Sequence, residues 1–147
     1  MKPQELRIGN IVKIDDEYLG PIEGKVTSLN EKAEVELLLS VNKGNIRYFR
    51  CGSDDIFPIP ITQKLLLKIG FKKDRNGYFA YREYNDELSL RFSSNYTFIE
   101  YANLCFNPED VTETNYSSSL EFPNTLHLHT LQNVWYLLTG KELEIKL

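Results

Sequence analysis

The chain has 147 residues, of which 41% are hydrophobic and 26% are charged, and its mean hydropathy is −0.37. This length and composition indicate one folded domain or two very small ones, and they exclude a disordered tail. The 17 Lys and Arg residues against 21 Asp and Glu residues give a net charge of −4, which argues against a protein that binds nucleic acid over most of its surface.

Targeting signals are missing from the sequence. No run approaches the roughly 18 apolar residues that a membrane span needs. The start, MKPQELRIGN, lacks the charged stretch and apolar run of a signal peptide. We therefore expect a cytoplasmic protein that does not contact a membrane. Cys51 and Cys105 lie far apart among apolar neighbours, which is typical of buried thiols rather than of a disulfide.

The first 60 residues contain short apolar runs separated by turn-forming residues, among them Gly20, Pro21 and Gly24. These runs are residues 5–14, 24–29, 33–41 and 45–49. Runs of this length and spacing predict an SH3-like β-barrel of about five strands. Pro58 and Pro60 cannot donate ladder hydrogen bonds, so they indicate an extended connector and a boundary near residue 60.

The second half begins with a short helix, which Thr62 caps and Gly70 ends. Alternating patterns then predict three antiparallel strands in an antiparallel meander, at residues 76–84, 87–93 and 95–104. Residues 107–125 are rich in Ser, Thr, Asn and Pro and predict a long surface loop.

The last predicted element is a helix that starts near Leu128 and ends at Gly140. Its apolar residues recur every three or four positions, so we expect that face to lie on the sheet of residues 78–104. The whole chain is then an α+β protein. A barrel of residues 1–60 is followed by a unit of residues 61–147, either as a second domain or as part of one compact domain.

Both histidines lie near the start of this last helix. On a helix, side chains two positions apart are separated by about 200°, so His127 and His129 converge on a metal only if the backbone is extended there. No third ligand has a recognisable spacing, and we expect neither a metal nor a cofactor.

A polar strip follows from the same helical spacing. His129, Gln132, Asn133 and Tyr136 lie at i, i+3, i+4 and i+7, away from the apolar face. Such a strip can bind a protein partner through hydrogen bonds and the tyrosine ring. The alternative is that Gln132 and Asn133 face water while His129 fills a gap at the helix start.

A basic cluster precedes the predicted meander and is followed by tyrosines. Its members are Lys64, Lys68, Lys72, Lys73 and Arg75, with Tyr78 and Tyr81 among the aromatic residues after them. Cations beside strand aromatics are the ingredients of a surface for single-stranded nucleic acid. The alternative is ordinary: lysines occupy the wet face of a short helix, and tyrosine is a common strand residue.

No pair of residues has the setting of a catalytic acid and base, and common nucleotide-binding and hydrolase motifs are absent from the sequence. We therefore expect a non-enzymatic interaction protein. Nucleic-acid binding is the main alternative, and sequestration of a small ligand such as a nucleotide between the two halves is a further one. The oligomeric state stays open.

Three motifs resemble a group of small uncharacterised proteins carried by phages, prophages and other mobile elements of gut bacteria. They are the start ELRIGNIV, the connector PIPIT followed by LLLKIGF, and the end HTLQNVWYLLTGKEL. They occur in the same order and span nearly the whole chain. The matching residues are Leu6, Gly9, Asn10, Pro58, Pro60, Gly70, Phe71, His129, Leu131, Gln132, Asn133 and Gly140.

This resemblance implies a cytoplasmic accessory protein of a mobile element that acts on host proteins or on nucleic-acid metabolism, and we expect it to bind a host or phage protein. It implies no activity and no cofactor, because the group has none established. The stretch 107–125 lies outside the matching motifs.

Overall fold

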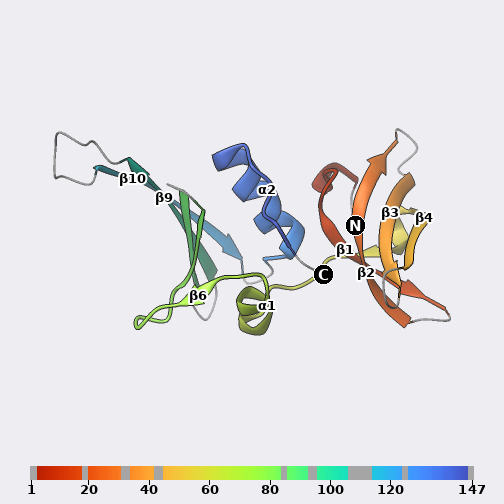
Figure 1. The fold of residues 1–147 in the computed structure, drawn as a ribbon, viewed down its shortest axis with the longest axis horizontal. Helices are drawn as coiled ribbons and strands as arrows, with labels where there is room; N and C mark the ends of the chain where they lie inside the picture. The colour runs from red at the N-terminus through yellow and green to blue at the C-terminus, as the bar shows by residue number, and fades with distance from the viewer. Residues whose placement is uncertain are drawn as a thin grey trace. The chain divides into compact units, whose positions relative to one another are not determined.

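A computed structural model describes residues 3–17, 20–30, 34–41, 45–83, 86–92, 96–105, 114–123 and 126–145. The chain divides into two compact units. The first unit comprises Met1–Pro60 and His127–Leu147, and the second unit comprises Ile61–Leu126. In the described residues each unit contains one five-stranded antiparallel sheet, so the protein is α+β (Figure 1).

The first sheet has the strand order β4-β3-β2-β1-β5. Its strands are β1 (Ile11–Asp16), β2 (Gly20–Leu29), β3 (Glu34–Val41), β4 (Asn45–Gly52) and β5 (Ile56–Phe57). Two 3₁₀ turns, Pro3–Glu5 and Ser53–Asp55, precede β1 and β5. Five strands agree with the prediction for this region. Among the described residues β4 does not pair with β5, so a closed barrel is not shown.

Strand β2 differs from the expectation because it runs through Pro21 and Gly24 without a break. A Cβ atom at Gly24 would lie 2.6 Å from Leu39 Cδ2, so glycine lets the Leu39 side chain cross the strand. Leu39 belongs to a core built from alternate strand residues with Leu6. Its buried members are Leu6, Val12, Ile14, Val26, Val35, Leu37, Leu39 and Ile56.

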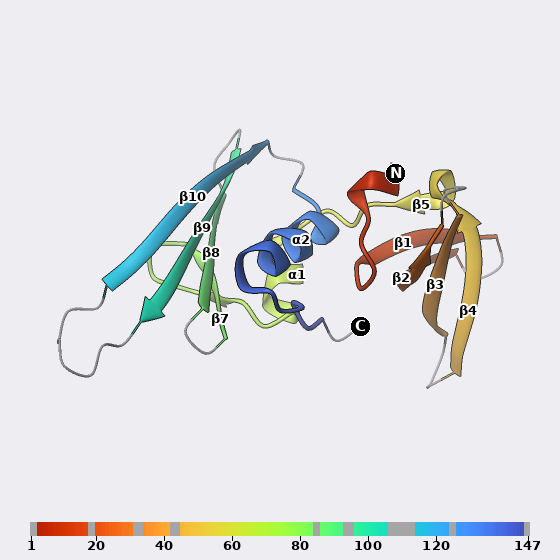
Figure 2. The same ribbon diagram turned by 90° about the horizontal axis from the view of Figure 1, so that it is seen from above.

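The second unit begins with helix α1 (Gln63–Lys68). The predicted cap is confirmed, since Thr62 Oγ1 accepts a hydrogen bond from the Leu65 amide at 3.1 Å. Gly70 follows the helix with a φ of 100°, a conformation that favours glycine. Figure 2 shows α1 on one side of the second sheet.

The second sheet is a meander with the order β10-β9-β8-β7-β6, which confirms the antiparallel prediction. Its strands are β6 (Lys72–Lys73), β7 (Phe79–Glu83), β8 (Asp86–Phe92), β9 (Tyr96–Cys105) and β10 (Thr114–Pro123). Its buried face carries Phe79, Leu88, Leu90 and Ile99.

Strand β10 corrects the prediction of a loop at residues 107–125. Thr114–Pro123 pairs with β9 over ten registered positions. Ser and Thr supply little apolar periodicity, but Thr is well suited to a strand and the neighbouring β9 supplies hydrogen-bond partners. Residues 107–113 and 124–125 lie outside the described residues.

Helix α2 (Leu128–Thr139) ends as predicted at Gly140, which has a φ of 71° and donates to Tyr136 O at 2.8 Å. The expected unit of residues 61–147 needs correction, because α2 belongs with the first unit. Its polar side chains hydrogen-bond the backbone of residues 5–11. The second unit is thus inserted between β5 and α2, where Leu128 N donates to Ile59 O at 2.9 Å. No described helix is long and apolar enough to cross a membrane.

Candidate nucleic-acid interface

Two members of the predicted polar strip, Gln132 and Asn133, form hydrogen bonds within the first unit. Gln132 is only 2% exposed; its Oε1 accepts from the Ile11 amide at 2.8 Å and its Nε2 donates to Gly9 O at 3.3 Å. Asn133 Oδ1 accepts from Asn10 Nδ2 at 2.9 Å, and its Nδ2 donates to Glu5 O at 3.1 Å. These amides fasten α2 to the segment before β1, so neither is free to recognise a partner.

The third member, His129, is buried at 4% exposure. Its ring stacks on that of His127 with 5.7 Å between centroids, and within the described part of the chain its Nδ1 has no hydrogen-bond partner. Burial lowers the pKa of His129, the charge of His127 lowers it further, and Glu5 opposes this. The described residues hold no group of three metal-ligating side chains, so this pair does not form a metal site there.

The last member, Tyr136, is 42% exposed. The Arg7 guanidinium lies 3.9 Å from its ring centroid, and the same group donates to both carboxylate oxygens of Glu142 at 2.7 and 3.0 Å. The hydrogen bond from Arg7 holds the pKa of Glu142 below its ordinary value. The Tyr136 ring therefore packs against the Arg7–Glu142 ion pair, and the rest of its surface is exposed to solvent.

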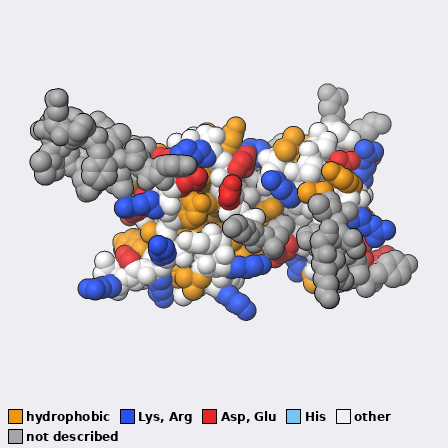
Figure 3. Space-filling model, viewed as in Figure 1, with side chains coloured by type: hydrophobic (Ala, Val, Ile, Leu, Met, Phe, Trp, Pro, Cys, Tyr) orange, Lys and Arg blue, Asp and Glu red, His pale blue; other side chains and the backbone are white. Residues whose placement is uncertain are grey.

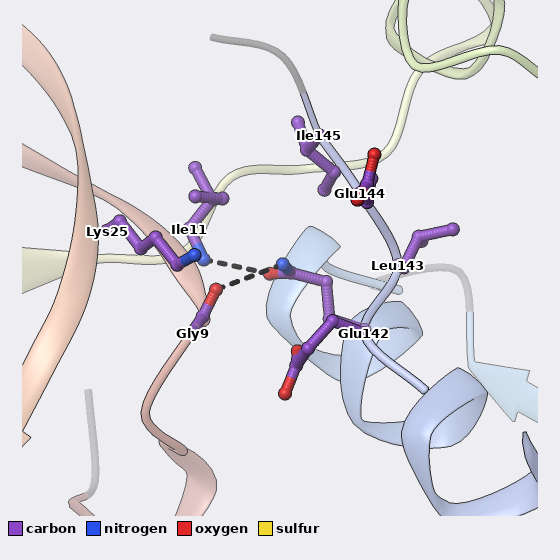
Figure 4. A pocket seen from close by; sticks show the side chains of 8 residues that line it. Gly9, Ile11, Lys25, Glu142, Leu143, Glu144 and Ile145 are labelled. Atoms are coloured by element: carbon purple, nitrogen blue, oxygen red, sulfur yellow. Dashed lines mark hydrogen bonds between the residues drawn. The ribbon is translucent and has the colours of Figure 1, made fainter. Parts of the chain in front are cut away.

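A pocket of about 410 Å³ lies in the first unit beside Gln132 (Figure 4). Lys25 supplies one cation to its wall, whereas Glu142 and Glu144 supply two carboxylates. Ile11 and Leu143 form the apolar part. Arg7 neutralises Glu142, which leaves one cation and one carboxylate on the wall, so no excess of positive charge attracts the phosphates of a nucleotide to this pocket.

The basic cluster is exposed in the second unit. The accessible side chains are Lys64 and Lys68 on α1, Lys72 and Lys73 on β6, and Arg75 in the following turn. Residues 61–83 contain six Lys and Arg against two Asp and Glu, a net charge of +4 in a chain of net charge −4. Figure 3 shows blue side chains gathered over α1 and the β6 hairpin. None of the salt bridges among the described residues involves these five side chains.

Local hydrogen bonds fix the hairpin that carries the cluster. Asp74 Oδ1 accepts from the amides of Asn76 at 2.9 Å and Tyr78 at 2.8 Å, and the Asp74 amide donates to Tyr78 O at 2.8 Å. Gly77 has a φ of 86° at the end of this turn. The Lys73 ammonium lies 3.5 Å from Gln63 Oε1, which brings β6 next to α1. Lys73, in register with buried Phe79, therefore lies on the helix side with the α1 cations, whereas Lys72, in register with Ala80, lies on the opposite face of β6.

The two predicted tyrosines lie on different faces of the second sheet. Tyr81 pairs in register with buried Leu88, and its ring lies 5.3 Å from that of Phe71, so it belongs to the packed face. Tyr78 lies on the opposite face, where Arg91 donates to its hydroxyl at 3.2 Å. Tyr78 therefore lies on the same face of the sheet as Lys72, whereas Tyr81 lies on the face of Lys73.

Two residues of this face were not predicted as site residues, namely Arg91 and Phe98. They are registered neighbours on β8 and β9. The alternation of Leu88 and Leu90 on the buried face already places Arg91 on the other face. The pairing of Arg91 with Phe98 depends on the strand register, which the sequence does not specify.

Comparisons of this chain with protein-family models, with curated proteins and with solved structures find no match.

Proposed function

We propose that the protein is a non-enzymatic binding protein whose second unit contacts the phosphates of nucleic acid. The observation that carries this proposal is the exposed basic surface of α1 and the β6 hairpin, defined by Lys64, Lys68, Lys72, Lys73 and Arg75. Cations that form no salt bridge within the described residues remain available to displace counterions from a nucleic-acid backbone. The acidic remainder of the chain confines such binding to this surface.

An ordinary role for the lysines of β6 also exists. Lysines on a short edge strand prevent edge-to-edge aggregation. That role explains Lys72 and Lys73 but not the cations of α1 or Arg75. The five cations lie on three successive elements at the β6 edge of the second sheet, and this concentration of positive charge favours an anionic partner.

The test is fluorescence anisotropy of a labelled single-stranded oligonucleotide with the full chain and a Lys72→Gln, Lys73→Gln variant. Each phosphate contact on a single strand contributes about −0.7 to the slope of log affinity against log salt, so the variant should lose about 1.4 from that slope. A Lys25→Gln, Arg47→Gln variant removes two exposed cations from the first unit instead, and it should bind like the parent.

Two outcomes contradict the proposal. One is the absence of binding at low salt. The other is an equal loss of slope in both variants, because that would trace binding to total charge rather than to the basic surface. Circular dichroism of each variant verifies that the fold is intact.

Protein binding is a second candidate, supported by Leu137, which is 83% exposed on α2. A photoreactive amino acid at position 137 should cross-link one recurrent protein in bacterial cells. The control is the same group at Leu67, which is 54% exposed on α1. The same set of cross-linked proteins from both positions would contradict a specific site at Leu137.

The strand order of the first sheet, with β5 returning to β1, supports our proposal that this sheet is an SH3-like barrel. We also propose a cytoplasmic accessory role in a mobile element, supported by the ELRIGNIV, PIPIT and HTLQNVWYLLTGKEL motifs. Neither proposal alters the test of the basic surface.

A further inference from the structure

The face of the second sheet opposite its buried core is open to solvent. Core residues alternate with this outer face along each strand, as Leu88 and Leu90 do with Ser89 and Arg91. On the outer face Lys72, Arg82, Arg91 and Glu100 are all exposed. In Figure 2, α1 lies beside the sheet on one side only. The outer face is therefore accessible to solvent.

One row across this face combines two aromatic rings with a guanidinium. Arg91 pairs in register with Phe98, and its guanidinium lies 3.2 Å from the Tyr78 hydroxyl and 5.4 Å from the ring centroid. Tyr78 and Phe98 are two strands apart, which corresponds to about 10 Å. Both rings are partly accessible, so each can stack on a separate planar group.

The next row has small side chains between two charged ones. Lys72 pairs in register with Ala80, Ala80 pairs with Ser89, and Ser89 pairs with Glu100. This row lies beside the row of Tyr78, Arg91 and Phe98. The cation at its end is positioned to meet a phosphate.

Charge is divided across the outer face. Lys72 and Arg91 lie on the β6 to β8 side, whereas Glu100 and Glu121 lie on β9 and β10. Arg82 is already neutralised by Glu87, whose Oε2 accepts from it at 2.6 Å. A polyanion on this face is therefore attracted to the β6 to β8 side, where the basic surface of α1 and the β6 hairpin begins.

We infer that the outer face binds unpaired bases of a single strand, with Tyr78, Arg91 and Phe98 as the stacking row. This inference rests on the proposed function, which supplies the phosphate contacts, and it adds the class of nucleic acid. A paired base keeps its faces within the duplex stack, so duplex cannot use the row. Stacking tolerates any base, so little sequence preference is expected.

The experiment compares three labelled oligonucleotides of equal length: a single strand, the same backbone without bases, and the duplex. The full chain should bind the single strand at least about fivefold more tightly than the abasic strand, since stacking makes that contribution per base. Phe98→Leu should reduce this difference, because one of the two stacking rings is lost, and Phe98→Tyr should retain it in full. Phe57→Leu on β5, where Phe57 is 48% exposed, is the matched control and should change nothing.

The outcomes separate the two proposals. Equal binding of single and abasic strands by the full chain overturns stacking while leaving phosphate binding intact. An undiminished preference in Phe98→Leu overturns the assignment of the row. Absence of binding to all three oligonucleotides overturns the proposed function together with the stacking row.

Discussion

Single residues decide how α2 joins the first unit. The Ile11 amide and the Gly9 carbonyl are buried and form hydrogen bonds with the Gln132 side chain instead of with another backbone group. The sequence places Gln132 correctly on the polar side of the helix. It does not reveal that this side is covered, because the covering segment lies 121 residues earlier in the chain.

We expect Gln132→Ala to lower the free energy of unfolding by about 1–3 kcal/mol, because the Ile11 amide loses its acceptor in a buried site. Urea denaturation measures this change. Leu137→Ala on the same helix is the control, since an exposed side chain should alter stability by less than about 0.5 kcal/mol. Equal effects of the two substitutions would show that the Gln132 hydrogen bonds contribute nothing.

His129 should make stability depend on pH. Its pKa in the folded protein is lowered by burial and by His127, so the unfolded chain binds the proton more readily. The contribution of His129 to the free energy of unfolding is complete above the pKa of histidine in the unfolded chain, about 6.5. It is lost as the pH falls towards the lower pKa of His129 in the folded protein. Unfolding free energies measured from pH 7.5 to pH 5 should decline more steeply in the parent than in His129→Leu. Parallel curves would contradict this reading.

Among the elements, α1 follows most directly from local sequence. Thr62 offers the cap and Gly70 the left-handed stop, and both features are present. Thr62→Ala should lower stability by about 1 kcal/mol, whereas Thr62→Ser should be nearly neutral because it keeps a hydroxyl acceptor. Thermal unfolding of the two variants measures the difference, and an equal loss in both would refute the capping role.

Strands were harder to predict than this helix. The apolar alternation of β8 is plain in the sequence, whereas β10 contains three consecutive serines, a composition that is typical of a loop. Its partner β9 supplies the pairing that composition alone does not show. Tyr78 and Tyr81 also show the limit of composition. They are close in sequence, but residues three apart in a strand lie on opposite faces of the sheet.

For the whole molecule, net charge and local charge point in opposite directions. The sum of −4 led to the expectation that nucleic acid is the less favoured partner, yet residues 61–83 alone carry +4. The sequence shows that these cations are close together along the chain. Only the fold shows that all of them are exposed, on three neighbouring elements. Because binding through this local charge must weaken as salt is added, the dependence of affinity on ionic strength is the most informative measurement.

The central claim is that the second unit binds nucleic acid through its basic surface. The most direct measurement is the affinity of the full chain for a labelled single strand between 50 and 300 mM salt, concentrations of the order at which phosphate contacts lose affinity. Contacts from all five cations predict a log–log slope of about −3.5. Undetectable binding at the lowest salt, or an affinity that does not change with salt, would contradict the account.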